Sequence, residues 1–495
     1  MNEYMMKPYD IAIIGGGVIG CSIARWVSKY RLKTILIEKH ADVATETTKG
    51  NSAIIHAGYA SSEGSLQSEM NVKGNPMFDQ LQKEINFDFK RVGSFVVAFN
   101  DEDMKDLQKE QNQADKRNIP SEIITDIKRI KIMEPNIADN VKAVLYAPSA
   151  GIIWPFGLTI GLAENAYDNG VDLLFSSPVT EIQQKSNGFI IQAGQKQLNA
   201  KVIINAAGVY ADEIARMVGA DNFTITPRKG EYILMDRNAI PVNHILFPIP
   251  TPVSKGILVC PTIEGHTFIG PNSNAQNDKE DVSTTSAGLN EIIRGGRKLL
   301  PSIPLRKAIA NFAGLRAVSD RDGDFIIEAS EVENFINVAG ICSPGLSSCL
   351  AIADLVTDIV KNHTTLSFGE KDSWNPIRFP QQRLKDMNED TLAQAIKNRP
   401  EWGRVICRCE TVTEAEIIDA IHRPIGATTL DMIKVRLRPR MGRCNGGFCT
   451  PKLLKILSRE LDKLVTEIPK NDEGSEMVTD RTKFIENKPW KGETP

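Results

Sequence analysis

A glycine-rich loop near the N-terminus places the strongest constraint on the fold. Tyr9–Ile14 reads YDIAII, an apolar run that is typical of a buried strand in a parallel sheet. GGGVIG follows it directly, so Gly15, Gly17 and Gly20 occupy the glycine positions of G-x-G-x-x-G. Such glycines allow a tight turn, a close approach of phosphate to the backbone, and close helix–strand packing. The segment therefore predicts a phosphate-binding turn between a strand and a helix.

The residues after the loop complete a dinucleotide-binding unit. We expect a helix over Cys21–Tyr30 and a second strand over Lys33–Ile37. Glu38 ends that strand, where an acidic side chain can accept the hydroxyl groups of a ribose. A tight turn without a ligand is the alternative interpretation. NAD and FAD enzymes share this unit, and its single copy predicts that the chain binds one of the two.

Two later stretches favour FAD. Lys201–Gly208 (KVIINAAG) reads as another buried strand, and its end at Ala207 and Gly208 is small enough for close backbone approach. Val338–Leu346 (VAGICSPGL) ends in SPG before a helical run, so we expect a second helix N-terminus to face a negative group. Near a flavin that group is the reduced ring. An ordinary strand-to-helix turn is the alternative for both stretches.

Four of the eight cysteines cluster near the C-terminus. They form the pairs Cys407-x-Cys409 and Cys444-x4-Cys449, which can converge on one soft metal centre once the intervening helices fold back. Structural zinc is the alternative, but zinc ribbons usually use C-x2-C to C-x4-C pairs. The tight C-x-C therefore predicts a [2Fe-2S] cluster that is bound by these four thiolates.

Length and composition indicate a globular chain of about two to four domains, with 495 residues and a net charge of -3. No basic block is present, which argues against a nucleic-acid partner. The N-terminal MNEYMMKPYD lacks the apolar stretch of a signal peptide, and no later run reaches the roughly 18 apolar residues of a spanning helix. We expect a cytoplasmic protein without a transmembrane segment, whose cysteines are thiols or metal ligands.

The order of the motifs over residues 7–365 resembles the D-amino-acid-oxidase-like flavoprotein superfamily, and within it the glycerol-3-phosphate dehydrogenases and L-2-hydroxyglutarate oxidases. The motifs are GGGVIG, Glu38, NSAIIHAGY (Asn51–Tyr59), NAAG, PRKGEY (Pro227–Tyr232), AGLR (Ala313–Arg316) and GICSPGL. ICRCETVTEAEI and MGRCNGGFC resemble the [2Fe-2S] domain related to bacterioferritin-associated ferredoxin (BFD). The combination is similar to the A subunits of anaerobic glycerol-3-phosphate dehydrogenases.

The resemblance implies an α/β fold, in which a Rossmann-like FAD-binding domain is interleaved with an α+β substrate domain and followed by a small helical [2Fe-2S] domain. The expected segments are 1–74, 150–220 and 310–368 for FAD, 75–149 and 221–309 for substrate, 369–400 for a linker, 401–470 for the cluster, and 471–495 for a tail. Within the cluster domain, Thr413 and Glu416 form a capping box, a further helix begins at Thr428, and another begins at Thr450-Pro451 with Thr450 as its N-cap residue. The cysteines then lie at helix ends.

The resemblance also implies the residues of the site. The predicted FAD contacts are Gly15, Gly17, Gly20, Glu38, Asn51, Ser52, Ala207, Gly208, Gly340, Pro344, Gly345 and Leu346. His56 and His266 are the candidates for the base that takes the hydroxyl proton, with structural roles as the alternative. Arg316 is the candidate for binding a substrate carboxylate or phosphate. Arg228 and Lys229 are weaker candidates, because basic residues between strands are usually solvated.

The activity that the resemblance implies is FAD-dependent dehydrogenation of a small anionic alcohol, first of all glycerol 3-phosphate to dihydroxyacetone phosphate. Glycerol-3-phosphate enzymes carry an arginine before the asparagine that matches Asn51, and Gly50 stands there instead. A 2-hydroxy acid such as L-2-hydroxyglutarate, and then an amine or amino acid, therefore stay open as substrates.

The cluster favours a dehydrogenase over an oxidase, because an oxidase returns electrons to dioxygen at the flavin itself. The expected acceptor is a partner subunit or carrier, through which the chain could associate with a membrane surface. A non-catalytic electron-transfer or redox-sensing scaffold is the alternative of another class.

Overall fold

The computed structural model describes residues 8–250 and 256–480, which form two compact units. The first unit comprises Met1–Lys39 and Val43–Arg378, and the second comprises His40–Asp42 and Phe379–Pro495. The start of the N-terminal segment, part of the expected substrate domain (251–255) and the end of the expected tail (481–495) lie outside the described residues.

The first unit contains an eight-stranded sheet with the order β10-β11-β12-β1-β2-β9, in which β20 also pairs with β12, and β19 with β20. Its strands are β1 (Pro8–Ile14), β2 (Thr34–Ile37), β9 (Asp172–Leu174), β10 (Val179–Lys185), β11 (Gly188–Ala193), β12 (Lys196–Asn205), β19 (Ile326–Ala329) and β20 (Phe335–Ala339). β12, β1, β2 and β9 run parallel, and β2 is buried along its whole length, as its continuous apolar sequence requires. The predicted α/β fold is confirmed.

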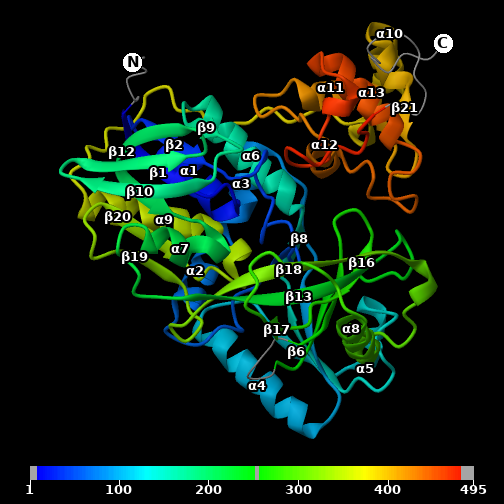
Figure 1. Cartoon of the computed structure of the whole chain (residues 1–495). Helices are drawn as coiled ribbons and strands as arrows, with labels where there is room; N and C mark the ends of the chain where they lie inside the picture. Colours follow the sequence, from blue (N-terminus) through cyan, green and yellow to red (C-terminus); the bar gives the residue numbers. More distant parts are fainter. Residues whose placement is uncertain (1–7, 251–255, 481–495) are drawn as a thin grey trace. The chain divides into compact units, whose positions relative to one another are not determined.

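Three helices pack together beside this sheet (Figure 1): α1 (Val18–Val27), α6 (Pro155–Asp168) and α9 (Gly345–His363). α1 begins at Val18, before the expected Cys21, because Gly17 is its extended N-cap residue. Arg25 of α1 is buried, and its Nη2 lies 2.6 Å from Glu84 Oε2 at the end of α3 (Met77–Ile85). α2 (Leu66–Gly74) packs on α9, and α7 (Ala211–Arg216) packs on β12 and β20.

A second sheet of nine strands has the order β17-β13-β16-β15-β14-β5-β7-β6, with β18 paired to β13. Its strands are β5 (Ser94–Ala98), β6 (Glu122–Ile124), β7 (Ala143–Ala147), β13 (Ile225–Met235), β14 (Ile245–Pro248), β15 (Leu258–Pro261), β16 (Thr267–Gly270), β17 (Asn274–Ala275) and β18 (Ala308–Ser319). β18 thus joins this sheet, although the expected FAD-binding segment begins at residue 310. Antiparallel pairing places Arg228 of β13 opposite Arg316 of β18.

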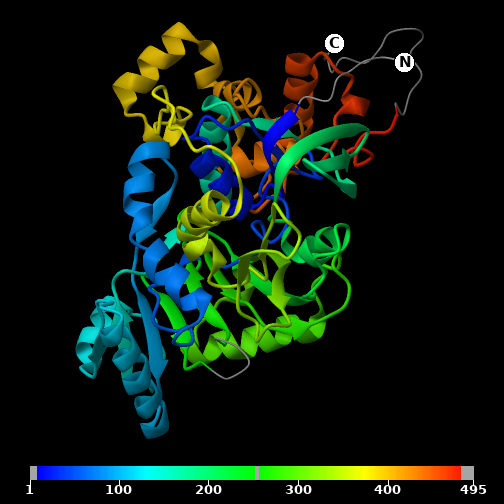
Figure 2. The ribbon, with the colours of Figure 1, turned by 90° about the vertical axis from the view of Figure 1, so that its left-hand side faces the viewer.

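Helices lie on both faces of this second sheet, with α4 (Asp101–Lys116) on one side and α5 (Ile127–Met133) and α8 (Ser286–Leu299) on the other in Figure 1; Figure 2 shows the same ribbon turned by 90°. α4 packs on one face with Val96 and Leu145, whereas α5 and α8 pack on the other with Val97 and Val144. The alternation of neighbouring residues between the two cores is the period of two that a strand imposes.

A short sheet and a C-terminal strap complete the first unit. β3 (Ile54–Ile55), β8 (Gly151–Ile153) and β4 (Phe89–Arg91) form the short sheet. In the strap, which is the beginning of the expected linker, Trp374 Nε1 donates to Ser28 Oγ at 3.1 Å, and Arg378 Nε donates to Glu164 Oε2 at 2.5 Å. Residues 369–378 therefore pack on the first unit.

The second unit is mainly helical. It contains α10 (Glu389–Asn398), α11 (Glu414–Ile421), α12 (Leu430–Leu437) and α13 (Thr450–Leu461), with a small sheet of β21 (Val405–Cys407) and β22 (Val412–Thr413). The Thr413–Glu416 capping box forms as predicted. α12 is capped by Thr429 and not by Thr428, and Cys449 is the N-cap residue of α13, so the expected cap at Thr450 is wrong. Across residues 8–250 and 256–480, no helix combines the length and apolarity needed to cross a bilayer.

Candidate functional site

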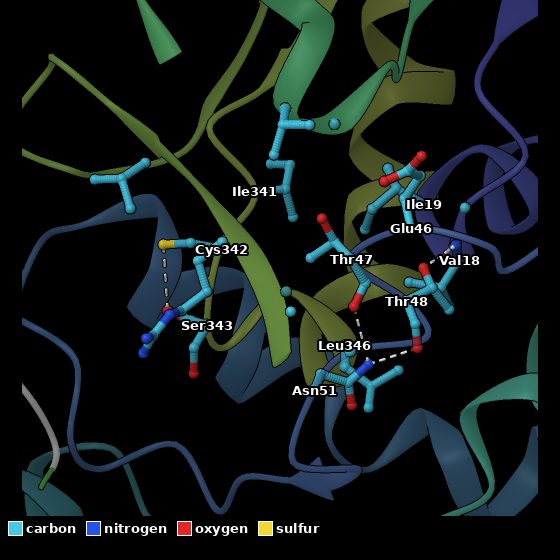
Figure 3. A pocket seen from close by; sticks show the side chains of 18 of the residues that line it. Val18, Ile19, Glu46, Thr47, Thr48, Asn51, Ile341, Cys342, Ser343 and Leu346 are labelled. Atoms are coloured by element: carbon cyan, nitrogen blue, oxygen red, sulfur yellow. Dashed lines mark hydrogen bonds between the residues drawn. The ribbon is translucent and has the colours of Figure 1, made fainter. Parts of the chain in front are cut away.

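A cavity of about 770 Å³ lies in the first unit, where loops of the first sheet meet β13 and β18 of the second. Most of the predicted residues line it: Gly15, Gly17, Glu38, Asn51, Ser52, His56, Ala207, Gly208, Arg316, Pro344, Gly345 and Leu346. Figure 3 shows Thr47, Thr48 and Asn51 on one lining loop, Cys342 and Ser343 on another, and Leu346 at the start of α9. The cavity thus gathers segments that are distant in the sequence.

The glycine loop leaves space that side chains would fill. Gly15 has a φ of +113°, and a Cβ there would lie 2.4 Å from the carbonyl oxygen of Ala206. Gly20 is not among the lining residues; a Cβ on it would lie 1.9 Å from the carbonyl oxygen of Gly15. Gly20 therefore acts through helix–strand packing, whereas Gly15 and Gly17 leave the backbone open to a ligand, as a dinucleotide requires.

Two side chains hold the backbone N–H groups of this loop. Glu38, which is buried, accepts the N–H of Gly16 on Oε2 at 2.6 Å. Thr48 Oγ1 accepts the N–H of Val18 at 3.0 Å, a hydrogen bond that is drawn in Figure 3. Glu38 thus orders the loop and also lines the cavity, which fits its predicted place beside a ribose. Thr48 carries no sequence signal, since its contact with α1 is made only by folding.

The loop that carries Asn51 and His56 is tied to the start of α9. Asn51 Nδ2 donates to the carbonyl oxygen of Thr48 at 2.6 Å, and its Oδ1 accepts the N–H of Ala53 at 2.7 Å. The backbone N–H of His56 donates to Ser347 Oγ at 2.7 Å. These bonds hold the His56 imidazole on the cavity wall beside Phe247, with their ring centres 5.8 Å apart.

Two cations on neighbouring strands line the cavity. Arg316 is held by backbone carbonyl oxygens: its Nη2 donates to Asn272 at 2.7 Å and to Lys229 at 3.2 Å, and its Nε to Arg228 at 3.3 Å. Burial lowers the pKa of Arg316, because loss of water disfavours the charged form. Within the described residues no carboxylate pairs with Arg316 or with Arg228. Two like charges that face each other across strands are unfavourable, so this arrangement suits a bound anion.

Arg228 and Lys229, which the sequence does not distinguish, have different environments. Arg228 faces the cavity, whereas Lys229 is buried and its Nζ lies 2.6 Å from Asp281 Oδ2. The alternation along β13 separates them. Arg228 therefore joins Arg316 as a candidate for anion binding, and Lys229 does not.

Gly50 is fixed by close backbone packing. A Cβ on Gly50 would lie 2.6 Å from the Cα of Gly314, and one on Gly314 would lie 1.9 Å from the carbonyl oxygen of Gly50. No arginine could occupy position 50 without a backbone shift. The departure from the glycerol-3-phosphate pattern is thus part of how β18 approaches this loop.

His266 and Gly340 do not line the cavity. His266 is buried immediately before β16, and its Nδ1 lies 3.1 Å from the carbonyl oxygen of Met235 on β13. The strand pairing directs this imidazole into the sheet, so we assign it no role in the chemistry. Gly340 has a φ of +66° and packs against Ser319, which makes it a residue of the turn itself.

The four C-terminal cysteines meet as two pairs in the second unit. Cys409 Sγ and Cys444 Sγ lie 3.6 Å apart, and Cys449 donates to the sulfur of Cys407. Two sulfurs bound to one tetrahedral metal ion at about 2.3 Å lie about 3.7 Å apart. No three metal-binding side chains in the described parts of the chain surround a single ion. Two thiolates for each of two iron ions is the donor set of a [2Fe-2S] cluster, and it does not suit a single zinc ion.

The backbone around the cysteines supplies donors to sulfur. The N–H groups of Glu410 and Arg440 point to Cys407, and those of Gly446 and Phe448 point to Cys444. The Cys449 thiol, together with these N–H groups, lowers the pKa of Cys407 to about 6, although burial opposes the shift. Left-handed φ angles at Thr411, Arg438, Arg440 and Asn445 shape these loops. Thiolates with such donors fit an iron–sulfur cluster.

Comparison with known proteins agrees with both sites. The FAD dependent oxidoreductase family (DAO) matches residues 10–359, and the BFD-like [2Fe-2S] binding domain matches residues 405–459. The chain belongs to the family of FAD dependent oxidoreductases and carries a BFD-like [2Fe-2S] domain. The predicted cofactors, FAD and a [2Fe-2S] cluster, are confirmed, as is the assignment as an enzyme.

Particular relatives are glycerol-3-phosphate enzymes. The chain is 47% identical over 476 residues to "Glycerol 3-phosphate dehydrogenase" of Caloramator mitchellensis, which covers 96% of this chain and 99% of that protein. It is 34% identical to "Glycerol 3-phosphate oxidase" of Mycoplasma genitalium, over 75% of this chain and 98% of that one. The solved structure of dithionite-reduced L-alpha-glycerophosphate oxidase from Mycoplasma pneumoniae with FAD bound has a TM-score of 0.72 at 28% identity, and covers 76% of this chain and 100% of that one.

Proposed function

We propose that the chain oxidises glycerol 3-phosphate to dihydroxyacetone phosphate at FAD and passes the electrons through its [2Fe-2S] cluster to a partner. The observation that carries the substrate assignment is the pair Arg228 and Arg316, two cavity-lining cations without a carboxylate partner in the described chain. A phosphate monoester holds nearly two negative charges at one point near neutral pH. L-2-hydroxyglutarate spreads its two charges over the ends of a chain, which two adjacent cations suit less well.

Bound along the glycine loop and Leu346, FAD would supply the hydride acceptor for the carbon that carries the hydroxyl group, and oxidation of that alcohol to a ketone also releases one proton. His56 is the residue placed to take that proton from the substrate oxygen. Arg316, fixed by three carbonyl oxygens, holds the phosphate with Arg228 and so sets the distance from the reacting carbon to the flavin. The Tyr232 hydroxyl, 3.3 Å from Ser52 Oγ, adds a polar group to the same wall.

The cluster supports a dehydrogenase that delivers its electrons to a partner, and not an oxidase. A [2Fe-2S] cluster carries one electron at a time, which converts a two-electron oxidation into single transfers. None of the eight cysteines, all of which lie in the described residues, forms a disulfide, which supports a reducing compartment and hence the cytoplasm. A partner subunit or carrier receives the electrons, and any association with a membrane surface is through that partner.

An anaerobic titration of the purified protein tests the substrate. Absorbance of the oxidised flavin is followed during addition of glycerol 3-phosphate, L-2-hydroxyglutarate or an amino acid, with glycerol as the control without a phosphate. We expect bleaching with glycerol 3-phosphate at concentrations at which glycerol has no effect. Bleaching with the hydroxy acid or the amino acid alone would reassign the substrate, and a flavin that no donor reduces would favour the non-catalytic scaffold.

A further inference from the structure

The surface over the cysteine pairs is built from exposed residues. Cys407 and Cys449 are buried, whereas Cys409 is half-buried and Cys444 is exposed. Phe448, next to Cys449, is 39% exposed, and its backbone N–H points to Cys444. The outer sulfur pair thus opens onto a surface that carries a large aromatic ring, a residue type that is enriched in binding hot spots.

Two cations flank the ring. Arg408 Cζ lies 4.5 Å from the ring centre of Phe448, and Lys452 Nζ lies 4.4 Å from it. Both side chains are exposed, and neither meets a carboxylate in the described part of the chain. The contacts are within the range of cation–π attraction, which holds both charges beside the ring.

The sequence around this surface is one-sided in charge. Residues 432–459 contain no Asp or Glu, but four of their cations are paired with carboxylates from elsewhere in the second unit: Arg436 with Asp42, Arg438 with Glu410, Arg440 with Asp431 and Arg459 with Glu414. The positive charge beside the ring therefore comes from Arg408 and Lys452. Glu410 lies beside the cysteines, but its Oε2 is 2.9 Å from Arg438 Nε, which neutralises it. The chain as a whole has a net charge of -3, so this positive surface is a local feature.

We infer that Arg408, Phe448 and Lys452 form the docking surface for an acidic one-electron carrier protein. Charge complementarity selects an acidic partner and speeds its encounter, and the exposed aromatic ring supplies an apolar anchor close to the outer sulfur pair. The surface presents a single aromatic ring and no amphipathic helix face, which argues for a protein and against a lipid bilayer. The inference rests on the proposed function, since it concerns the acceptor of that reaction.

The electron count fixes how the surface is used. Oxidation of one substrate alcohol to a ketone releases two electrons and two protons. Each carrier accepts one electron and then dissociates in its reduced form. Two carrier molecules must therefore dock in turn for each substrate molecule. Turnover therefore requires rapid release of the carrier, and an exposed charged rim with one apolar anchor suits a short-lived complex.

Binding of an acidic [2Fe-2S] ferredoxin to the full-length holoenzyme tests the inference without turnover. With both proteins oxidised, we expect calorimetry to detect binding that weakens as salt rises, and no binding of a basic cytochrome c. The double variant Arg408→Glu and Lys452→Glu should weaken binding roughly tenfold or more, and Phe448→Ser should weaken it at unchanged charge. Cluster absorbance and circular dichroism should match the parent protein in each variant.

The matched control is the double variant Lys397→Glu and Lys463→Glu, which changes the net charge equally. Lys397 lies at the end of α10, and Lys463 follows the far end of α13, about 18 Å of helix from Thr450. This control should bind ferredoxin as the parent does. The inference would be overturned if both double variants weakened ferredoxin binding equally, or if the parent did not bind ferredoxin. It would also be overturned if the parent bound anionic phospholipid vesicles and the Arg408 and Lys452 changes abolished that binding. Anaerobic flavin bleaching, which needs no carrier, separates these outcomes from a failure of the proposed function.

Discussion

The cysteine centre and the cavity are assembled in opposite ways. All four predicted sulfur ligands come from residues 407–449 of the second unit, and two loops suffice to bring them together. The cavity draws its lining from residue 14 to residue 346, and its two arginines meet only because β13 pairs with β18. A site built locally is an independent part, whereas a site built from distant segments depends on the whole unit.

The largest expected effect comes from removing one inner sulfur. Cys407→Ser should abolish the visible absorption of the cluster, because a buried hydroxyl cannot replace the thiolate ligand. If the centre is a local structure, FAD should stay bound and glycerol 3-phosphate should still bleach it. Cys342→Ser, which changes a cysteine of the other unit, should keep both cofactors. Absorbance spectra measure all of these, and loss of FAD from Cys407→Ser would show that the two units are not independent.

The next largest effect concerns the cavity histidine. His56→Asn keeps the polarity and the backbone N–H bond to Ser347 but removes the base, so the rate of anaerobic flavin reduction should fall by about 10²- to 10⁴-fold. The fall should come mainly in the rate at saturating substrate. His363→Asn, at the exposed end of α9, is the matched control and should react as the parent does. Stopped-flow absorbance gives both rates, and an unchanged rate for His56→Asn would remove this residue from the proposed mechanism.

Removal of Arg316 and removal of Arg228 should slow anaerobic flavin reduction to different extents. Arg316→Ala removes a half-buried cation that three carbonyl oxygens fix, so we expect kcat/KM for glycerol 3-phosphate to fall about 100-fold. Arg228→Ala removes a partly exposed cation, and we expect a fall of about 10-fold. Arg321→Ala, which breaks a surface ion pair with Glu328, should change little. If Arg316→Ala acts no more strongly than Arg321→Ala, the anion site lies elsewhere.

The sequence predicts features that are built from neighbouring residues better than features that are built from distant segments. The glycine loop, Glu38 and the cysteine pairs are recognisable because their chemistry needs fixed residues at short spacing. The sequence gives Arg228 only as a weaker candidate beside Lys229 and does not indicate Thr48, since their roles arise from strand pairing and from a contact with α1. The sequence makes His266 a candidate base, but the strand pairing directs its imidazole into the sheet, towards the carbonyl oxygen of Met235. The N-cap of α13 lies one residue before the predicted Thr450 because Cys449, a predicted cluster ligand, takes that place.

The smallest expected effect tests the charge network that holds the cysteine domain together. Burial raises the pKa of Asp431, but Lys434, Lys470 and Arg440 lower it by more, so the net pKa lies below its usual value of about 3.9. A lowered pKa adds stability above the unfolded pKa, and that stability is lost as the pH falls through the folded value. Asp431→Asn should therefore cost about 1 kcal/mol at neutral pH and nothing once the pH is well below the lowered pKa of Asp431.

Thermal loss of the cluster absorption, measured from pH 7 downwards, checks the Asp431 prediction, with Glu473→Gln as the control. Glu473 is an exposed carboxylate of the same unit that has no ion pair within the described residues. Its variant should track the parent at every pH. If Asp431→Asn also tracked the parent at pH 7, the ion pairs around Asp431 would contribute nothing net, and the apolar core around Leu430, Ile433 and Leu453 would hold the cysteine loops alone. Protonation makes Asp431 uncharged like asparagine, so the difference in stability between the parent and Asp431→Asn should shrink as the pH falls. A difference in stability that grew towards low pH would contradict a lowered pKa for Asp431.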